Sequence, residues 1–190
     1  MPGGLRGSRA YTGGVTDLLL RPARTSDVPA IKDLVAPLVR EGVLISKDTV
    51  AYYEGIQEFL VVEAVGDDGT PCLAGCGALH VMWEDLGEVR TLATSEQWRG
   101  RGVGRTLLAG LLERARAVGV SRVFCLTFEV DFFARLGFEV MANQEPIDPD
   151  VFAELLRSHD EGVAEYLDLA RVKPNTLGNT RMVHQLSREG

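Results

Sequence analysis

A glycine-rich stretch, Gln97–Arg105, constrains the fold of this chain more than any other segment. Its sequence is Gln-Trp-Arg-Gly-Arg-Gly-Val-Gly-Arg, and a helical pattern follows at once. Glycine has no Cβ, so backbone N–H groups can approach an anion closely, and the first turn of the following helix adds unpaired N–H groups and the positive end of its dipole. Three arginines lie among these glycines in a chain of net charge −7. The stretch therefore predicts a local anion site, of the kind that holds a pyrophosphate.

The spacing of the glycines separates this stretch from two other phosphate-binding signatures. A dinucleotide fingerprint, G-x-G-x-x-G, would need its third glycine where Arg105 stands, and a P-loop would need Gly-Lys-Ser/Thr, which the chain lacks. What fits is Gln97-x-x-Gly100-x-Gly102, overlapped by Arg-Gly-x-Gly-x-Gly. A plain glycine-rich turn that enters a helix is the alternative.

The flanking segments predict a strand before the glycines and a helix after them. A two-residue period places Glu88, Arg90, Leu92 and Thr94 on one face of a strand over residues 88–94. Apolar residues then recur at three- and four-residue steps up to a glycine at position 119, which is typical of an amphipathic helix and its end. These apolar residues are Val103, Leu107, Leu108, Leu111, Leu112, Ala115 and Val118.

The whole chain predicts an α/β (α+β) fold with a central mixed sheet flanked by helices. We expect one domain over residues 17–190, behind a disordered leader over residues 1–16. Thr25 or Ser26 is expected to cap a helix that Pro37 kinks or ends. The other expected elements are strands at 17–21, 59–65, 72–83, 121–127, 137–140 and 181–186, and helices at 48–56, 130–136 and 151–157.

Composition excludes several classes of function. An acidic chain with a pI near 5.0 is a poor candidate for binding nucleic acid, which depends on neutralising phosphates. No apolar run approaches the length of a membrane span and the leader lacks the apolar centre of a signal peptide, so we expect no membrane partner and a cytoplasmic location. Cys72 and Cys76 lie roughly 13 Å apart on one extended strand, too far for a disulfide, and their spacing is poor for zinc. We expect a buried Cys125 and no metal.

The order strand, glycine loop, helix, strand, helix and Leu136-Gly137-Phe138 resembles the core of the GNAT superfamily of N-acetyltransferases, and the loop resembles its acetyl-CoA loop. Four segments are similar to the acetyltransferase domain of bacterial N-acetylglutamate synthase. The similarity spans about residues 18–186 and lacks the kinase-like domain of long forms, so the chain resembles the short, stand-alone form. The four segments are Val35–Lys47, Glu58–Val62, Val120–Thr127 and Phe132–Phe138.

The resemblance implies a GNAT acyl-CoA N-acyltransferase fold and an enzyme that uses acetyl-CoA as co-substrate. The implied reaction transfers acetyl to the α-amine of glutamate or glutamine, the first step of arginine biosynthesis. The residues implied to bind acetyl-CoA are Leu92, Ala93, Thr94, Arg99, Gly100, Arg101, Gly102, Val103, Gly104, Arg105 and Phe133.

An amine attacks a thioester only when it is unprotonated, so such a site needs a base and a donor to the carbonyl oxygen. Glu88 is the candidate base, directly or through water, with a structural salt bridge to Arg90 as the alternative. The resemblance implies that backbone N–H groups near Leu92 are the donors. Phe133 stands where many GNAT enzymes have an acidic tyrosine, and is either a wall against the pantetheine or plain core. The other aromatic and imidazole groups considered are Tyr52, Tyr53 and Tyr166 as acids, and His80, His159 and His184 as structural or solvated side chains.

An amino-acid acceptor carries carboxylates, which need Arg or Lys held against their oxygens. The resemblance places such groups in the loop before residue 48 and near the C-terminus. The candidate acceptor residues are Ser46, Lys47, Arg90, Thr91, Asn179, Thr180 and Arg181.

Two other functions remain open alongside amino-acid acetylation. A catalytically silent acyl-CoA sensor could keep the glycine loop and lose turnover, as the phenylalanine at position 133 allows. A GNAT enzyme that acetylates protein amines would need an open acidic groove for a peptide. The sequence is also compatible with a homodimer.

Overall fold

The computed structural model describes residues 18–66, 69–141, 147–169 and 178–186. Its centre is a seven-stranded sheet in the order β1-β2-β3-β4-β5-β7-β6. Neighbouring strands are antiparallel except β4 and β5, which are parallel. The strands are β1 (Leu19–Pro22), β2 (Phe59–Val65), β3 (Pro71–Val81), β4 (Leu86–Thr94), β5 (Arg122–Thr127), β6 (Glu139–Val140) and β7 (Thr180–Gln185).

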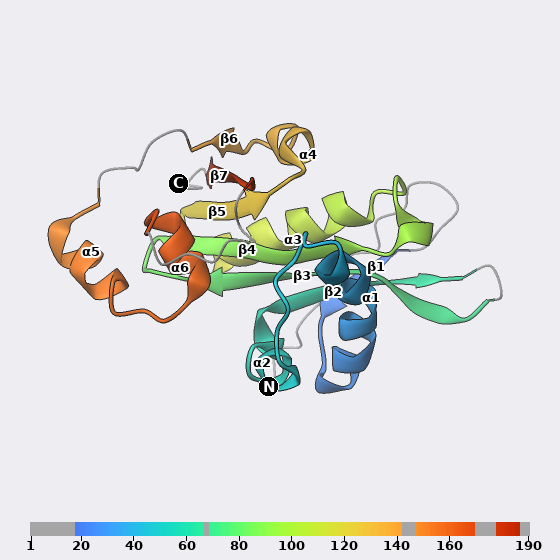
Figure 1. Ribbon diagram of the computed structural model, residues 1–190. Coiled ribbons are helices and arrows are strands. Elements are labelled where there is room, and N and C mark those ends of the chain that lie inside the picture. The colour runs from blue at the N-terminus through green and yellow to red at the C-terminus, as the bar shows by residue number, and fades with distance from the viewer. Residues whose placement is uncertain (1–17, 67–68, 142–146, 170–177, 187–190) are drawn as a thin grey trace, which may run out of the picture.

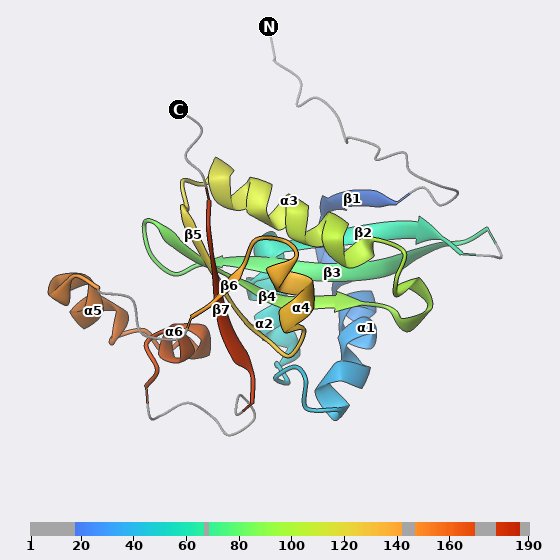
Figure 2. The same cartoon turned by 90° about the horizontal axis from the view of Figure 1, so that it is seen from above.

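Helices cover both faces of this sheet (Figure 1), which confirms the predicted mixed sheet with flanking helices. Helices α1 (Val28–Arg40) and α2 (Thr49–Glu54) lie on one face, and α3 (Val103–Ala117) lies on the other. Viewed from above (Figure 2), α3 lies over the sheet, while α5 (Pro149–Leu155) and α6 (Glu161–Tyr166) lie beside the end of the sheet near β7. The short helix α4 (Val130–Ala134) connects β5 to β6. Among the described residues, no helix is long and apolar enough to cross a membrane.

Helix α3 forms where the apolar period predicts it. Its buried face, which includes Leu107, Leu108 and Leu111, packs on β2 and β3. Gly102 is the N-cap residue, and at the other end the N–H of Val120 donates to the carbonyl of Ala115, which closes the last turn. The helix therefore begins directly at the predicted anion loop.

Strand β4 changes its neighbours along its length. Its first three residues, Leu86–Glu88, pair with β5, and no pairing with β5 is found beyond Glu88 among the described residues. On its other side, β4 stays paired with β3 up to Thr94 but contains a bulge, because both Thr91 and Leu92 stand opposite Gly77. Thr91 has φ 55°, a left-handed conformation that is rare for a β-branched residue. The sheet thus opens between β4 and β5 just after Glu88.

Two local predictions differ from the structure. Residues Thr25–Asp27 form a 3-10 turn and Asp27, not Thr25 or Ser26, is the N-cap of α1, because Pro29 favours the first turn of a helix. Helix α1 does not end at Pro37 but continues to Arg40. Pro37 is exposed, and the buried residues Val28, Ile31 and Val35 on the opposite face of α1 offset the hydrogen bond it cannot donate.

The short helix α6 was not predicted, because its six residues are too few to show a period. The expected leader, residues 1–16, lies outside the described residues, as does Asp17. The cysteines are free: Cys72 is half-buried, and Cys76 and Cys125 are buried.

Candidate active site

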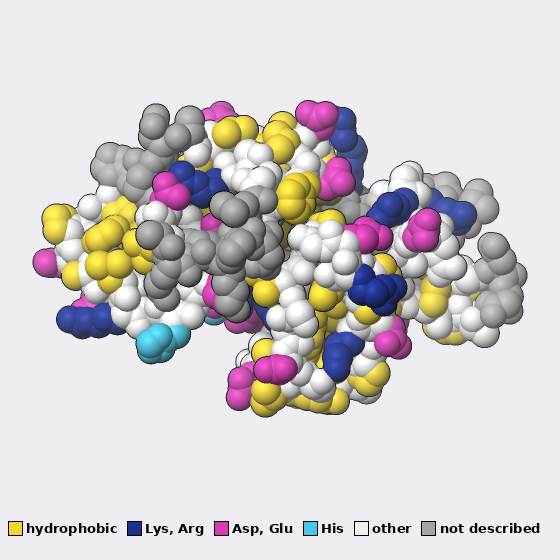
Figure 3. Space-filling view, in the orientation of Figure 1, with side chains coloured by type: hydrophobic (Ala, Val, Ile, Leu, Met, Phe, Trp, Pro, Cys, Tyr) yellow, Lys and Arg dark blue, Asp and Glu magenta, His cyan; other side chains and the backbone are white. Residues whose placement is uncertain are grey.

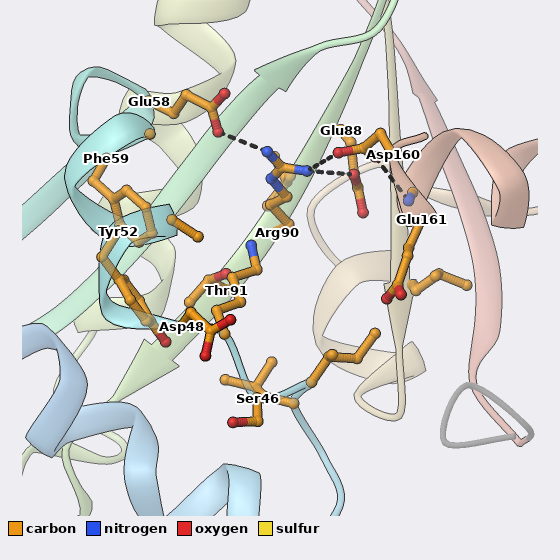
Figure 4. Close-up of a pocket in the computed structure, with 18 of the residues that line it drawn as sticks. Ser46, Asp48, Tyr52, Glu58, Phe59, Glu88, Arg90, Thr91, Asp160 and Glu161 are labelled. Atoms are coloured by element: carbon orange, nitrogen blue, oxygen red, sulfur yellow. Dashed lines mark hydrogen bonds and ion pairs between the residues drawn. The ribbon is translucent and has the colours of Figure 1, made fainter. Parts of the chain in front are cut away.

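A cavity of about 460 Å³ opens between the β4 residues at the bulge, the α1–α2 loop, helix α2 and the first turn of α6. It therefore lies where β4 separates from β5. Figure 4 shows its polar side chains converging from these elements, and on the face drawn in Figure 3 charged side chains of both signs lie between the α6 side and the α2 side. Among the sequence-predicted site residues, Ser46, Lys47, Glu88, Arg90, Thr91 and Asn179 line this cavity.

Glu88 is the most unusual group of the cavity. Its residue is 5% exposed, and its Oε2 has no hydrogen-bond partner among the described residues. Burial raises the pKa of Glu88 to about 7; Asp160 adds to this effect, while Arg90, Lys47 and His80 oppose it. A carboxyl with this pKa exchanges its proton near neutral pH, as a general base must.

Arg90 hydrogen-bonds two carboxylates, those of Asp160 and Glu58, and makes only a longer ion pair with Glu88 (Figure 4). Its Nη1 donates to Asp160 Oδ2 at 2.9 Å and its Nη2 to Glu58 Oε2 at 2.9 Å, whereas the nearest Glu88 oxygen is 3.8 Å from Nη1. His80 Nδ1 lies 2.7 Å from Glu58 Oε1. Each Nη group of Arg90 already hydrogen-bonds a carboxylate. The structure therefore favours a role for Arg90 in holding the walls of the cavity together over a role as a free cation that binds a substrate.

Glu58, Asp160 and Gly162 are site residues that the sequence did not reveal. Asp160 is the N-cap of α6, where its Oδ1 accepts hydrogen bonds from the N–H groups of Gly162 and Val163. The ion pair from Arg90 to Asp160 joins residues 70 positions apart, and that to Glu58 joins residues 32 apart. Such contacts have no local sequence signal; only the capping pattern of Asp160 could have marked the start of α6.

Lys47 also lines the cavity, and no ion pair of its ammonium group is found among the described residues. It is half-buried, and burial, reinforced by Arg90, lowers its pKa, while Glu88, Glu58 and Asp160 act in the opposite direction. Its neighbour Ser46 is exposed and also lines the cavity. The α1–α2 loop thus brings one ammonium group to the cavity.

The glycine loop has the geometry that an anion cradle requires. Gly100 and Gly102 have φ of +73° and +86°, and a Cβ at either position would meet no atom within 4 Å. Their backbone therefore borders open space at the start of a 15-residue helix. Arg99, Arg101 and Arg105 are exposed, with no carboxylate pairing found for them among the described residues, and Arg101 lies 5.0 Å over the ring of Trp98.

The remaining predicted residues fall into two groups. Leu92 is part of the bulge on β4 and Ala93 and Thr94 follow it, while Val103 and Gly104 begin α3 beside them; a Cβ on Gly104 would lie 3.6 Å from Thr94 Oγ1. By contrast, Thr180 and Arg181 on β7 do not line the cavity, and Arg181 Nη2 lies 3.6 Å from Asp168 Oδ2.

Aromatic and histidine candidates are also separated by the fold. Phe133 is a core residue, packed edge-on against Phe132 and Phe138. Of the three tyrosines only Tyr52 lines the cavity, and burial raises its pKa; Tyr53 is exposed, and Tyr166 packs on Phe124. His159 lines the cavity, His80 belongs to the network around Arg90, and His184 stacks on Phe138.

The raised pKa of Glu88 has a measurable effect on stability. A carboxyl whose pKa is about 7 when folded and near 4.5 when unfolded contributes stability below pH 4.5, and this contribution is lost as the pH rises through 7. When the pH is raised from 5.5 to 8.5, we expect the free energy of unfolding of Glu88→Gln to rise by roughly 1–3 kcal/mol relative to that of the parent. Urea unfolding at both pH values measures this change.

Glu154→Gln is the matched control, because Glu154 is exposed on α5 and pairs only with Arg157 in the described part of the chain. Its difference from the parent should not change with pH. Equal stability differences for Glu88→Gln at the two pH values would show that Glu88 has an ordinary pKa.

Comparison with known proteins identifies the family of this chain. A model of the acetyltransferase (GNAT) family matches residues 32–138. The amino-acid acetyltransferase of Mycobacterium tuberculosis is 50% identical over 165 residues, which cover 87% of this chain and 92% of that protein. The amino-acid acetyltransferase of Neisseria meningitidis is 35% identical over 128 residues, 66% of this chain but 28% of that protein.

Two solved structures share the fold. The crystal structure of Rv2747 from Mycobacterium tuberculosis, in complex with CoA and NLQ, has a TM-score of 0.81 and 49% identity, and the match covers 88% of this chain and 99% of that one. The N-acetylglutamate synthase of Neisseria gonorrhoeae, complexed with coenzyme A and N-acetyl-glutamate, has a TM-score of 0.69 and 28% identity over 90% of this chain and 35% of that one. The chain spans only about a third of the length of these Neisseria proteins. It belongs to the acetyltransferase (GNAT) family and, within it, to the amino-acid acetyltransferases.

Proposed function

We propose that this amino-acid acetyltransferase transfers the acetyl group of acetyl-CoA to the α-amine of glutamate or glutamine. The observation that carries the proposal is the buried Glu88, whose pKa is raised to about 7, at the point where β4 separates from β5. The similarity to an N-acetylglutamate synthase and to an amino-acid acetyltransferase supports the same reaction.

The glycine loop fits the pyrophosphate of acetyl-CoA. Acetyl-CoA supplies an activated acetyl thioester when it is bound. The open backbone at Gly100 and Gly102 would hold the phosphates, with Arg99, Arg101 and Arg105 adding positive charge. Leu92–Thr94, at and just after the bulge, would line the pantetheine side and offer backbone N–H groups to the carbonyl oxygen.

Glu88 is the group of the cavity suited to accept a proton. An α-amine is largely protonated at neutral pH and must lose that proton before it attacks. A carboxyl with pKa about 7 is both deprotonated often enough and basic enough to take the proton, directly or through water. Tyr52, which lines the same cavity and keeps its proton because burial raises its pKa, is the candidate acid for the leaving thiolate.

The shape and charge of the cavity favour a small acceptor. Lys47, on the α1–α2 loop, and Asn179, just before β7, both line it and can receive the oxygens of an amino acid. The loop and α6 both border the cavity, which suits a free amino acid better than the extended peptide of a protein acetyltransferase. A titratable carboxyl in the cavity argues for turnover over a silent sensor. All these residues come from one chain, so the proposal does not require a homodimer.

The cofactor loop can be tested with two valine variants at opposite ends of α3. Gly102 and Gly119 both have left-handed φ, +86° and +90°, and open space at the Cβ position, so the backbone strain of a substitution is the same. Only Gly102 lies in the proposed cradle. We expect Gly102→Val to weaken acetyl-CoA binding at least about tenfold by calorimetry, since each lost charge-assisted contact costs about 1.5–3 kcal/mol, while Gly119→Val binds like the parent. Equal affinities for the two variants would remove the loop from the site.

The acceptor is tested by incubating the protein with acetyl-CoA and a panel of free amino acids, and by following the released thiol. We expect glutamate and glutamine to release thiol fastest. Lys47→Ala should then raise the acceptor KM about ten- to a hundredfold without changing acetyl-CoA binding, because a charge-assisted contact to a carboxylate is lost.

Arg181→Ala is the comparison variant, because Arg181 lies outside the cavity and should have the smaller effect. A larger effect of Arg181→Ala than of Lys47→Ala would move the acceptor pocket toward β7. If no amino acid releases thiol, the silent acyl-CoA sensor and the protein acetyltransferase become the better-supported hypotheses.

A further inference from the structure

The backbone of α6 packs directly against the carboxyl of Glu88. A Cβ added to Gly162 would lie 2.0 Å from Glu88 Oε2 and 2.7 Å from Glu88 Cδ. Both distances are far shorter than any real carbon contact, so only glycine fits at position 162. No water can stand between this turn of α6 and the carboxyl on that side.

Asp160 fixes the turn that carries Gly162. Its Oδ1 accepts the N–H of Gly162 at 2.8 Å, which holds the first turn of α6 together. Its Oδ2 accepts from Arg90 Nη1 at 2.9 Å, which ties the same turn to β4. One carboxylate therefore sets both the shape of the turn and its place over Glu88.

The pairing of Arg90 with Asp160 also decides what Glu88 can bind. Arg90 Nη1 is 2.9 Å from Asp160 Oδ2 but 3.8 Å from Glu88 Oε2, which is beyond hydrogen-bond distance. The other Nη group is occupied by Glu58. Asp160 thus draws the guanidinium away from Glu88, whose own ionised form would otherwise be stabilised by a direct Arg90 hydrogen bond.

We propose that Asp160 and Gly162 are positioning residues for the acid–base step: Asp160 keeps Arg90 from hydrogen-bonding Glu88, and Gly162 closes the α6 side of the Glu88 carboxyl off from water. The inference rests on the proposed function, in which Glu88 takes the proton of the acceptor amine. In this proposal the start of α6, a helix that the sequence did not predict, controls the pH at which Glu88 is protonated.

Charged and titratable groups face Glu88 from several elements, and their opposing effects set the pKa of Glu88. Burial and Asp160 raise the pKa of Glu88, and Arg90, Lys47 and His80 lower it.

Asp160→Asn removes the nearby negative charge and frees Arg90 Nη1 for Glu88, so the pKa of Glu88 should fall. Gly162→Ala pushes the turn or the carboxyl aside and lets water reach it, so the pKa should fall again. The groups that face Glu88 are Arg90 on β4, His80 on β3, Cys125 on β5, Lys47 on the α1–α2 loop, and Asp160 and Glu161 at the start of α6, with Glu58 acting through Arg90.

The protonation of Glu88 can be measured without turnover. Protein labelled with ¹³C at the glutamate carboxyl is titrated by NMR between pH 4 and 9, and the Glu88 signal is the one absent from Glu88→Gln. We expect the Glu88 midpoint to fall by about one pH unit or more in Asp160→Asn and in Gly162→Ala. Asparagine keeps the oxygen that caps α6, so Asp160→Asn should fold even if Gly162→Ala does not.

Asp148→Asn is the matched control, because Asp148 caps the neighbouring helix α5 through the same pair of backbone N–H groups. It should leave the Glu88 midpoint unchanged. A Glu88 midpoint in Asp160→Asn equal to that of the parent would overturn the proposal. Failure of the proposed function would look different: the parent would release no thiol with any amino acid, while the titration would still report on Asp160 and Gly162.

Discussion

The separation of β4 from β5 after Glu88 is the constraint on which the rest of the site depends. Pairing stops at Glu88 and Phe124, and the bulge at Thr91 and Leu92 turns the following residues of β4 toward the glycine loop. A β-branched residue at φ 55° costs on the order of 1–2 kcal/mol. Packing around the bulge must therefore hold it in place.

Small residues on β3 make that packing feasible. A Cβ on Gly75 would lie 2.7 Å from Val103 Cγ1, and one on Gly77 would lie 2.9 Å from Leu92 Cδ1. The start of α3 and the bulged residue thus occupy the space that side chains on β3 would fill. The same two glycines allow the start of α3 and the bulge of β4 to lie directly against β3.

Local periodicity explains how much could be predicted from the sequence. The strand at Glu88, the glycine loop and α3 follow from two-residue and four-residue patterns and from glycines in a left-handed conformation, and the structure places them as expected. The sequence also indicated Glu88 and Lys47 as polar groups of one site. It could not show that Arg90 is already bound by Glu58 and Asp160, because these ion pairs join segments far apart in the chain. Arg181 looked equivalent to Lys47 in the sequence, and only the tertiary structure separates the two.

The central claim is that a buried carboxyl of near-neutral pKa takes the proton of the amine, and the pH dependence of kcat/KM for the acceptor tests it most directly. The acidic limb of that profile reports the free enzyme's base. We predict a limb with an apparent pKa near 7 in the parent, and its loss in Glu88→Gln together with a fall in kcat of about a hundredfold or more. A Glu88→Gln enzyme with the parent's kcat and the parent's acidic limb would show instead that the acceptor enters as the free amine without a protein base.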